Sequence, residues 1–190
     1  CAAIILTGLA YKEDNKYLVS GLNLLKKIIK SSINNEGFPK SRNIKQLIFY
    51  LKYFIIIREW LRESHHTIPD YIDETIYYLG QSYAFIWQNI NQDILFNGNH
   101  ISNNNEFDQY LKRFGYKFIN ENKVHAGYAI LKNKNITLAM DIGSSPIQKF
   151  SKDYQSGALS FEIISKGKKL INNSGYFADR NNKYNRFSKS

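Results

Sequence analysis

The feature that most constrains this fold is a change in hydrophobic period partway along the chain. In the first part, apolar residues recur every three or four positions, which is the spacing of an amphipathic helix. In the later part they alternate with polar residues, which is typical of half-buried strands. Helices followed by strands predict an α+β chain with two domains rather than repeated βαβ units.

Three long helices are expected in the first part. The first is amphipathic over 18–29, and the turn-forming residues 34–39 end it. The second covers about 43–63, and a break at 64–69 leads into a third helix that places Pro69 near its first turn and ends near residue 91. Long helices joined by short connections are expected to pack as antiparallel neighbours.

The later part is expected to form antiparallel strands. Two β-hairpins are predicted, 126–131 with 136–141 and 158–164 with 169–173. A linker at about 97–123 would separate them from the helices, with a short helix over 107–118.

Charge and cysteine content limit the possible functions. The chain has 26 Lys and Arg against 16 Asp and Glu, a net charge of +10. This surplus favours a polyanionic partner, although an AT-rich coding bias explains it equally well. The single cysteine excludes an internal disulfide framework and multi-cysteine zinc modules. A nucleic-acid binder is disfavoured because the sequence has no helix-turn-helix, zinc module or aromatic RNA-binding motif.

The two ends suggest an internal fragment of a longer protein. The chain begins at Cys1 with no initiator Met and no charged leader, and Ala2–Leu6 is interpreted as the tail of a buried helix. The basic segment 176–190 stops without a terminating pattern. No stretch approaches the roughly 20 apolar residues of a transmembrane span.

Three segments, in this order, resemble the heparinase II/III-like polysaccharide lyases. EGFPKSRN at 36–43 is similar to the family's D-G-G-x-x-S-R-N-P loop, and DILFNG at 93–98 to its D-G-x-L-A-L-F-N-G segment. GALSFE at 157–162, Gly167 and LINNSG at 170–175 resemble the hairpin H-A-G-x-L-S-F-E…G…L-I-V-N-C-G. The resemblance covers nearly the whole chain.

The resemblance implies an N-terminal (α/α) toroid that runs into a C-terminal antiparallel β-sandwich. The expected divisions are toroid helices over 1–96, a linker over 97–123 and the start of the sandwich over 124–190. It also implies an enzyme that cleaves an anionic, uronic-acid-containing polysaccharide by β-elimination, in the cell envelope or periplasm of a Gram-negative bacterium. The alternative is a polysaccharide-binding or envelope-assembly protein that keeps the scaffold without turnover.

Such a lyase must neutralise the substrate carboxylate, remove the C5 proton and protonate the leaving oxygen. Arg42 fits the first task because guanidinium groups bind carboxylates through two parallel hydrogen bonds, and Asn43 offers amide donors. Lys40 lies in the same loop and is a second expected substrate contact. The alternative is that Asn43 only caps the helix that follows it and Arg42 is solvated.

The proton-transfer group is expected to be a tyrosine or a histidine. Tyr83, on the third helix, and His125, near the predicted junction of the two domains, are the candidates for catalysis. Trp87 is a candidate platform for a sugar ring. Aromatic residues at helical spacing also suit a hydrophobic core, so both interpretations stay open for Tyr83 and Trp87.

The sequence departs from the family pattern at several positions. Gln155 stands where many relatives have a histidine, a second histidine is commonly found near Asp153, and Asn173 stands where some have an aspartate. These replacements are poor metal ligands, so no metal and no cofactor is expected. Gln46 and Leu47 replace a Tyr-His pair that many members place after the toroid loop.

Overall fold

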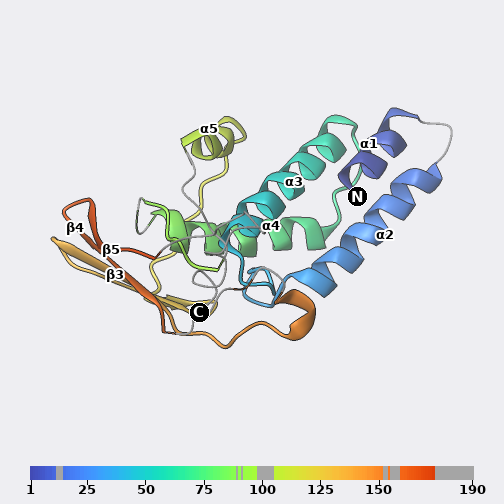
Figure 1. Ribbon diagram of the computed structural model, residues 1–190. Helices are drawn as coiled ribbons and strands as arrows, with labels where there is room; N and C mark the ends of the chain where they lie inside the picture. The colour runs from blue at the N-terminus through green and yellow to red at the C-terminus, as the bar shows by residue number, and fades with distance from the viewer. Residues whose placement is uncertain are drawn as a thin grey trace, which may run out of the picture.

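A computed structural model shows helices in the first part of the chain and one antiparallel sheet in the second (Figure 1). It describes residues 1–11, 15–88, 90, 92–97, 105–151, 154 and 159–173. The order of elements confirms the predicted α+β fold class. Within the described residues, no helix is long and apolar enough to span a membrane.

The helices follow the predicted apolar pattern closely. They are α1 (Ala2–Ala10), α2 (Asn15–Ser32), α3 (Ile44–Glu63), α4 (Asp70–Tyr83) and α5 (Asn105–Arg113). Pro69 precedes α4 as its N-cap, a position that its fixed φ allows. Asp70 and Asp73 lie in the first turn, where their negative charges interact favourably with the positive end of the helix dipole.

Three details of the predicted helices are wrong. The third helix leaves α geometry after Tyr83 and continues as a π-helix, η1 (Ala84–Gln88), whose first four residues are all buried. The helix expected over 107–118 is α5, which already ends at Arg113. Helix α1 buries only one face, since Ile5 is fully buried while Ile4 and Leu6 are 37% and 43% exposed.

The sheet is a five-stranded antiparallel meander in the order β1-β2-β3-β4-β5. Its strands are β1 (Val124–His125), β2 (Tyr128–Lys132), β3 (Ile136–Asp141), β4 (Phe161–Ser165) and β5 (Lys168–Ile171), and a short 3-10 helix, η2 (Gln148–Phe150), lies between β3 and β4. The predicted hairpins are β2–β3 and β4–β5. Pairing of β3 with β4, with Leu138 opposite Ile163, joins them into one sheet.

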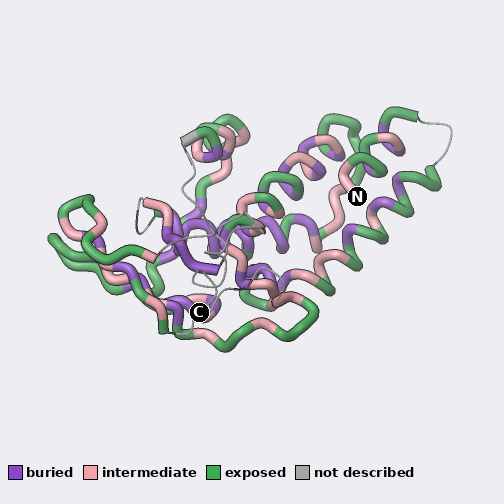
Figure 2. Tube along the Cα trace, viewed as in Figure 1, coloured by how far each residue is buried: buried purple, intermediate pink, exposed green. Residues whose placement is uncertain are grey.

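One cluster of buried apolar residues runs through both parts of the chain (Figure 2). It includes Leu47 and Phe54 of α3, Leu79 of α4, and Tyr128 and Ala139 of the sheet. The end of the sheet that carries β1 and the loop after β3 therefore packs directly against the helices. The predicted strand start at Ala158 and most of the Asn-rich part of the linker, 98–104, lie outside the described residues.

Candidate functional site

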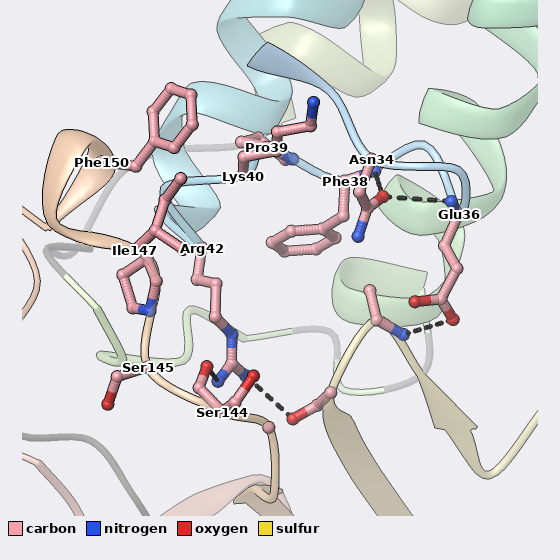
Figure 3. Close-up of a pocket in the computed structure, with 14 residues that line it drawn as sticks. Asn34, Glu36, Phe38, Pro39, Lys40, Arg42, Ser144, Ser145, Ile147 and Phe150 are labelled. Atoms are coloured by element: carbon pink, nitrogen blue, oxygen red, sulfur yellow. Dashed lines mark hydrogen bonds between the residues drawn. The ribbon is translucent and has the colours of Figure 1, made fainter. Parts of the chain in front are cut away.

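A cavity of about 350 Å³ lies where the loop after α2 meets the loops of the sheet (Figure 3). The helical part contributes residues from Asn34 to Arg42, and the sheet contributes 126–127 and the segment from Gly143 to Phe150. This cavity is called the interface pocket below. It is the place where the first motif of the sequence comes against the sheet.

The loop after α2 holds its shape through its own side chains. Asn34 Oδ1 accepts hydrogen bonds from the backbone N–H groups of Glu36 at 3.1 Å and Phe38 at 2.8 Å. The polar, Gly- and Pro-containing sequence suggests a loop that stays out of the core, but Phe38 is 1% exposed and packs 5.4 Å from the Tyr128 ring. The loop is therefore anchored in the core and is held rigidly beside the pocket.

Arg42 is buried and ion-paired, contrary to the alternative that it is solvated and to the expectation that it is free to grip a substrate. It is 8% exposed, and its Nη2 lies 2.6 Å from Asp141 Oδ1. Nη2 also donates to the Gly127 carbonyl at 2.9 Å, and Nη1 to the Ser144 carbonyl at 2.8 Å. Because Nη2 has both hydrogens engaged, the guanidinium has no pair of parallel donors left for a carboxylate.

Asp141 is the centre of a buried polar network that sequence reasoning missed. It is fully buried and its Oδ2 accepts from Asn97 Nδ2 at 2.8 Å. Asn97 Nδ2 also donates to the Tyr128 hydroxyl at 2.7 Å, and that hydroxyl donates to the Arg42 carbonyl at 2.9 Å. Burial raises the pKa of Tyr128 well above its usual value. The network joins the helical part, the segment after η1 and the sheet.

Asn43 and Lys40 both make contacts within the helical part. Asn43 Oδ1 accepts from the backbone N–H groups of Lys45 at 2.9 Å and Gln46 at 3.4 Å, so Asn43 caps helix α3. Lys40 lines the interface pocket, and its Nζ donates to the Lys30 carbonyl at 2.7 Å. Lys40 thus reaches the pocket, whereas Asn43 is not among the residues that line it.

Tyr83 and Trp87 lie in the core and not at the interface pocket. Their rings stack at 5.1 Å, and Tyr83 is fully buried. The Tyr83 hydroxyl donates to Asp108 Oδ1 at 2.6 Å, and burial together with this carboxylate raises its pKa far above the usual value. These positions do not suit a general base or an open sugar platform, because one hydroxyl is engaged and both rings are covered.

His125 lies next to the pocket wall and is held by the helical part. Its Nε2 is 2.7 Å from Ser82 Oγ, and Ser82 donates its single hydroxyl hydrogen to the Glu36 carbonyl at 3.0 Å. The one Ser82 hydroxyl therefore links the imidazole to the Glu36 backbone. Burial lowers the pKa of His125, against the opposing effect of nearby Glu36, so the ring is neutral at pH 7. The next residue, Ala126, lines the pocket.

Asn173 takes part in a second buried carboxylate cluster. Glu162 is fully buried, and its Oε1 accepts from the Asn173 backbone N–H at 3.3 Å and side-chain amide at 3.4 Å. Lys169 Nζ lies 2.8 Å from Glu162 Oε2. The other predicted positions of the lost metal site, Gln155 and Asp153, lie outside the described residues. Within the part of the chain that is described, no group of three or more His, Cys, Asp or Glu could hold a metal ion.

Comparison with known proteins gives a family match and a fold match. Residues 121–190 match the family model described as heparinase II/III-like, C-terminal. No curated protein matches the sequence. The heparan sulfate lyase HepC from Pedobacter heparinus is 15% identical, with a TM-score of 0.75 over 94% of this chain and 33% of that one.

Two further solved structures have the same fold. A heparinase III is 16% identical, with a TM-score of 0.75 over 98% of this chain and 36% of that one. A second heparinase III gene product is 14% identical, with a TM-score of 0.77 over 98% of this chain and 34% of that one. The chain thus spans about a third of the length of the structures it matches. At these identities the likeness establishes the fold.

Proposed function

We propose that this chain, whose residues 121–190 match the heparinase II/III-like C-terminal family model, forms part of a lyase that cleaves a uronic-acid-containing polysaccharide by β-elimination. The observation that carries the proposal is the His125 imidazole, held by Ser82 beside a pocket whose charged lining residues are Lys40, Arg42 and Glu36. The solved structures that share the fold include a protein named as a heparan sulfate lyase, which supports this class of reaction. A polysaccharide substrate also supports a place in the cell envelope.

The reaction needs positive charge near the substrate carboxylate and a base near C5. Arg42 supplies charge at the pocket wall, where its Nε–H and one Nη1–H have no partner among the described residues. Lys40 has three N–H groups and uses one of them on the Lys30 carbonyl. Both charges favour the enolate-like intermediate, in which negative charge moves onto the carboxylate.

His125 is the base in this proposal. Its imidazole takes the C5 proton, the C5–H electron pair forms the C4–C5 double bond as the C4–O bond breaks, and solvent water gives a proton to the leaving oxygen. A neutral imidazole suits this step because a lowered pKa keeps the lone pair available at pH 7. Ser82 Oγ lies 2.7 Å from Nε2 of the ring and also contacts the Glu36 carbonyl, so the imidazole is held in place by the helical part.

The alternative of a non-catalytic polysaccharide-binding protein also has a specific observation in its favour. Tyr83 is sequestered in the core and the Arg42 guanidinium is largely occupied by protein acceptors, so two groups expected at a lyase centre are engaged elsewhere. The two proposals share the substrate and differ only in turnover.

The experiment incubates the full-length protein with heparan sulfate and with alginate and follows the ultraviolet absorbance of the unsaturated product. We expect product from at least one polysaccharide, and a fall in rate of about 10²–10⁴-fold for His125→Gln, the range for loss of a general base. The exposed His66→Gln is the control, and rates are compared per folded molecule. Binding of either polysaccharide without product would favour the non-catalytic alternative, and an unchanged rate for His125→Gln would refute the assignment of the base.

A further inference from the structure

A second cavity, of about 320 Å³, borders the same loop as the interface pocket. It is lined by the end of α2, by the loop from Asn34 to Gly37, and by one face of α4. We call it the α4 pocket. Asn34, labelled in Figure 3, lines both cavities, so the two cavities border the same loop.

One face of α4 gives the pocket its chemistry. Tyr71, Glu74, Thr75 and Tyr78 are spaced i, i+3, i+4 and i+7, so they share one side of the helix. The two tyrosines are separated by about 10.5 Å along the axis at 1.5 Å per residue, which is close to the length of a disaccharide. Aromatic rings at the two ends with polar groups between them match the alternating apolar faces and hydroxyls of a sugar chain.

Tyr78 is the accessible ring of the pair. It is 41% exposed and is supported from the side by the edge of the Tyr77 ring, at 5.4 Å between centroids. Tyr71 is more enclosed, because its hydroxyl donates to the Leu22 carbonyl at 3.3 Å and Lys26 Nζ lies 5.7 Å from its ring centroid. Tyr78 is therefore the expected stacking platform, and Tyr71 forms a wall.

The α4 pocket differs from the interface pocket in having no cationic residue in its described lining, whereas Lys40 and Arg42 line the interface pocket together with Glu36. Its described lining contains the carboxylate of Glu74, the amides of Asn34 and Asn35, and no lysine or arginine, in a chain of net charge +10. An anionic sugar bearing sulfate or carboxylate would face Glu74 without a compensating cation among the lining residues. Sugar hydroxyls, in contrast, can donate to a carboxylate and accept from amides.

We infer that the α4 pocket is a saccharide-binding site for an uncharged sugar, next to the site that receives the acidic one. The inference rests on the proposed function and deepens it, because the polysaccharide would then carry unsulfated, uncharged residues beside its uronates. Because Asn34 lines both cavities, one polysaccharide chain would meet them at neighbouring positions. The α4 pocket selects by charge, because its described lining carries the Glu74 carboxylate and no lysine or arginine.

The test measures binding of a neutral chitin tetrasaccharide and of an anionic tetragalacturonate to the full-length protein by isothermal titration calorimetry. We expect Tyr78→Ala to weaken binding of the neutral probe by about 3- to 10-fold, the range for loss of one aromatic platform. Tyr53→Ala is the matched control, since Tyr53 is 40% exposed on α3 and lies outside the pocket. Glu74→Lys should lower the preference for the neutral over the anionic probe.

Two outcomes overturn the inference: no binding of the neutral probe to the unmodified protein, or equal effects of Tyr78→Ala and Tyr53→Ala. Retained preference for the neutral probe in Glu74→Lys would overturn the charge selection. These results are separable from the proposed function, because binding needs no turnover. Tyr78-dependent binding without unsaturated product refutes only the lyase, and product formation with Tyr78-independent binding refutes only this site.

Discussion

The Arg42–Asp141 ion pair is expected to be a large stabilising element that fastens the helical part to the sheet. Asp141→Asn removes the carboxylate charge at nearly constant size and leaves the guanidinium buried, since the two side chains are 10% and 0% exposed. Breaking a buried pair from one side typically costs about 3–5 kcal/mol. For a chain of this size each kcal/mol corresponds to about 2–4 °C, so the melting temperature should fall by about 6–20 °C.

The assay is a double-mutant cycle read by urea unfolding and thermal melting with circular dichroism. Arg42→Met removes the cation and keeps much of the side-chain length, but it also leaves the Gly127 and Ser144 carbonyls without their donor. The combined Arg42→Met and Asp141→Asn variant no longer contains an isolated buried charge. Its loss of stability should therefore be smaller than the sum of the single losses by about 0.5–3 kcal/mol.

An exposed arginine provides the control for this cycle. Arg62 is 57% exposed and pairs with Glu59, so Arg62→Met should cost at most about 1 kcal/mol. The reasoning is refuted if Asp141→Asn destabilises the protein no more than Arg62→Met does. It is also refuted if the two single losses at Arg42 and Asp141 add up to the loss in the double variant, because the two charges would then act independently.

Two further variants test other parts of the structure. Burial lowers the pKa of His125 from 6.5, so its contribution to stability is complete above that pH and is lost as the pH falls through the folded pKa. His125→Gln should weaken the acid dependence of urea unfolding between about pH 7.5 and 5.5, whereas the exposed His66→Gln should keep it, and equal pH profiles would contradict this assignment. Gly37→Ala would place a methyl group 2.3 Å from the Tyr78 carbonyl carbon at φ +72, whereas Gly115 at φ +74 has open space. Gly115→Ala should lower the free energy of unfolding by about 1–2 kcal/mol, and Gly37→Ala should lower it clearly more, as measured by thermal melting. Similar losses in the two variants would contradict the predicted clash with the Tyr78 backbone.

The helices and hairpins could be predicted because their causes are local. The apolar spacing within 43–63 is enough to indicate α3, and Asn43 before it provides the cap that the pattern suggested. The pairing of β3 with β4 could not be read in the same way, because the segment between them has neither a tight turn nor a regular pattern. The change to π geometry at Ala84 also has no local signal, since the apolar pattern simply continues through it.

The environment of Arg42 was predicted wrongly because its partner lies 99 residues away. A polar loop with Gly37 and Pro39 indicates exposure, and local sequence gives no sign of the buried anion. The sequence of β3 does indicate a buried carboxylate. Alternation along β3 places Asp141 on the same buried face as Ala139. A carboxylate on a core-facing position requires a buried partner, and an arginine in a family motif was a reasonable candidate.

The requirement that a buried carboxylate has a partner also applies to Glu162. In β4, Glu162 shares the buried face with Ile164, and besides Lys169 it accepts a hydrogen bond at 2.9 Å from the backbone N–H of Leu95 in the segment after η1. The two inward-facing acids of the sheet thus each bind a group contributed by the helical part. The Asp141 contact holds the sheet against Arg42 of the loop after α2, where the interface pocket lies, and the Glu162 contact holds β4 against the segment after η1.

The two cationic residues of the interface pocket, Arg42 and Lys40, have different contacts. Arg42 donates its hydrogen bonds to Asp141 and to the Gly127 and Ser144 carbonyls, which connects the two walls of the pocket. Its charge is partly offset by Asp141 at 2.6 Å. It therefore contributes positive potential to the pocket without being able to clamp a carboxylate. Lys40 has one N–H on a backbone carbonyl and no carboxylate partner among the described residues, so its charge is available to a ligand. Under the proposed function, direct contact with an acidic sugar is therefore assigned to Lys40, and Arg42 is a positioning residue.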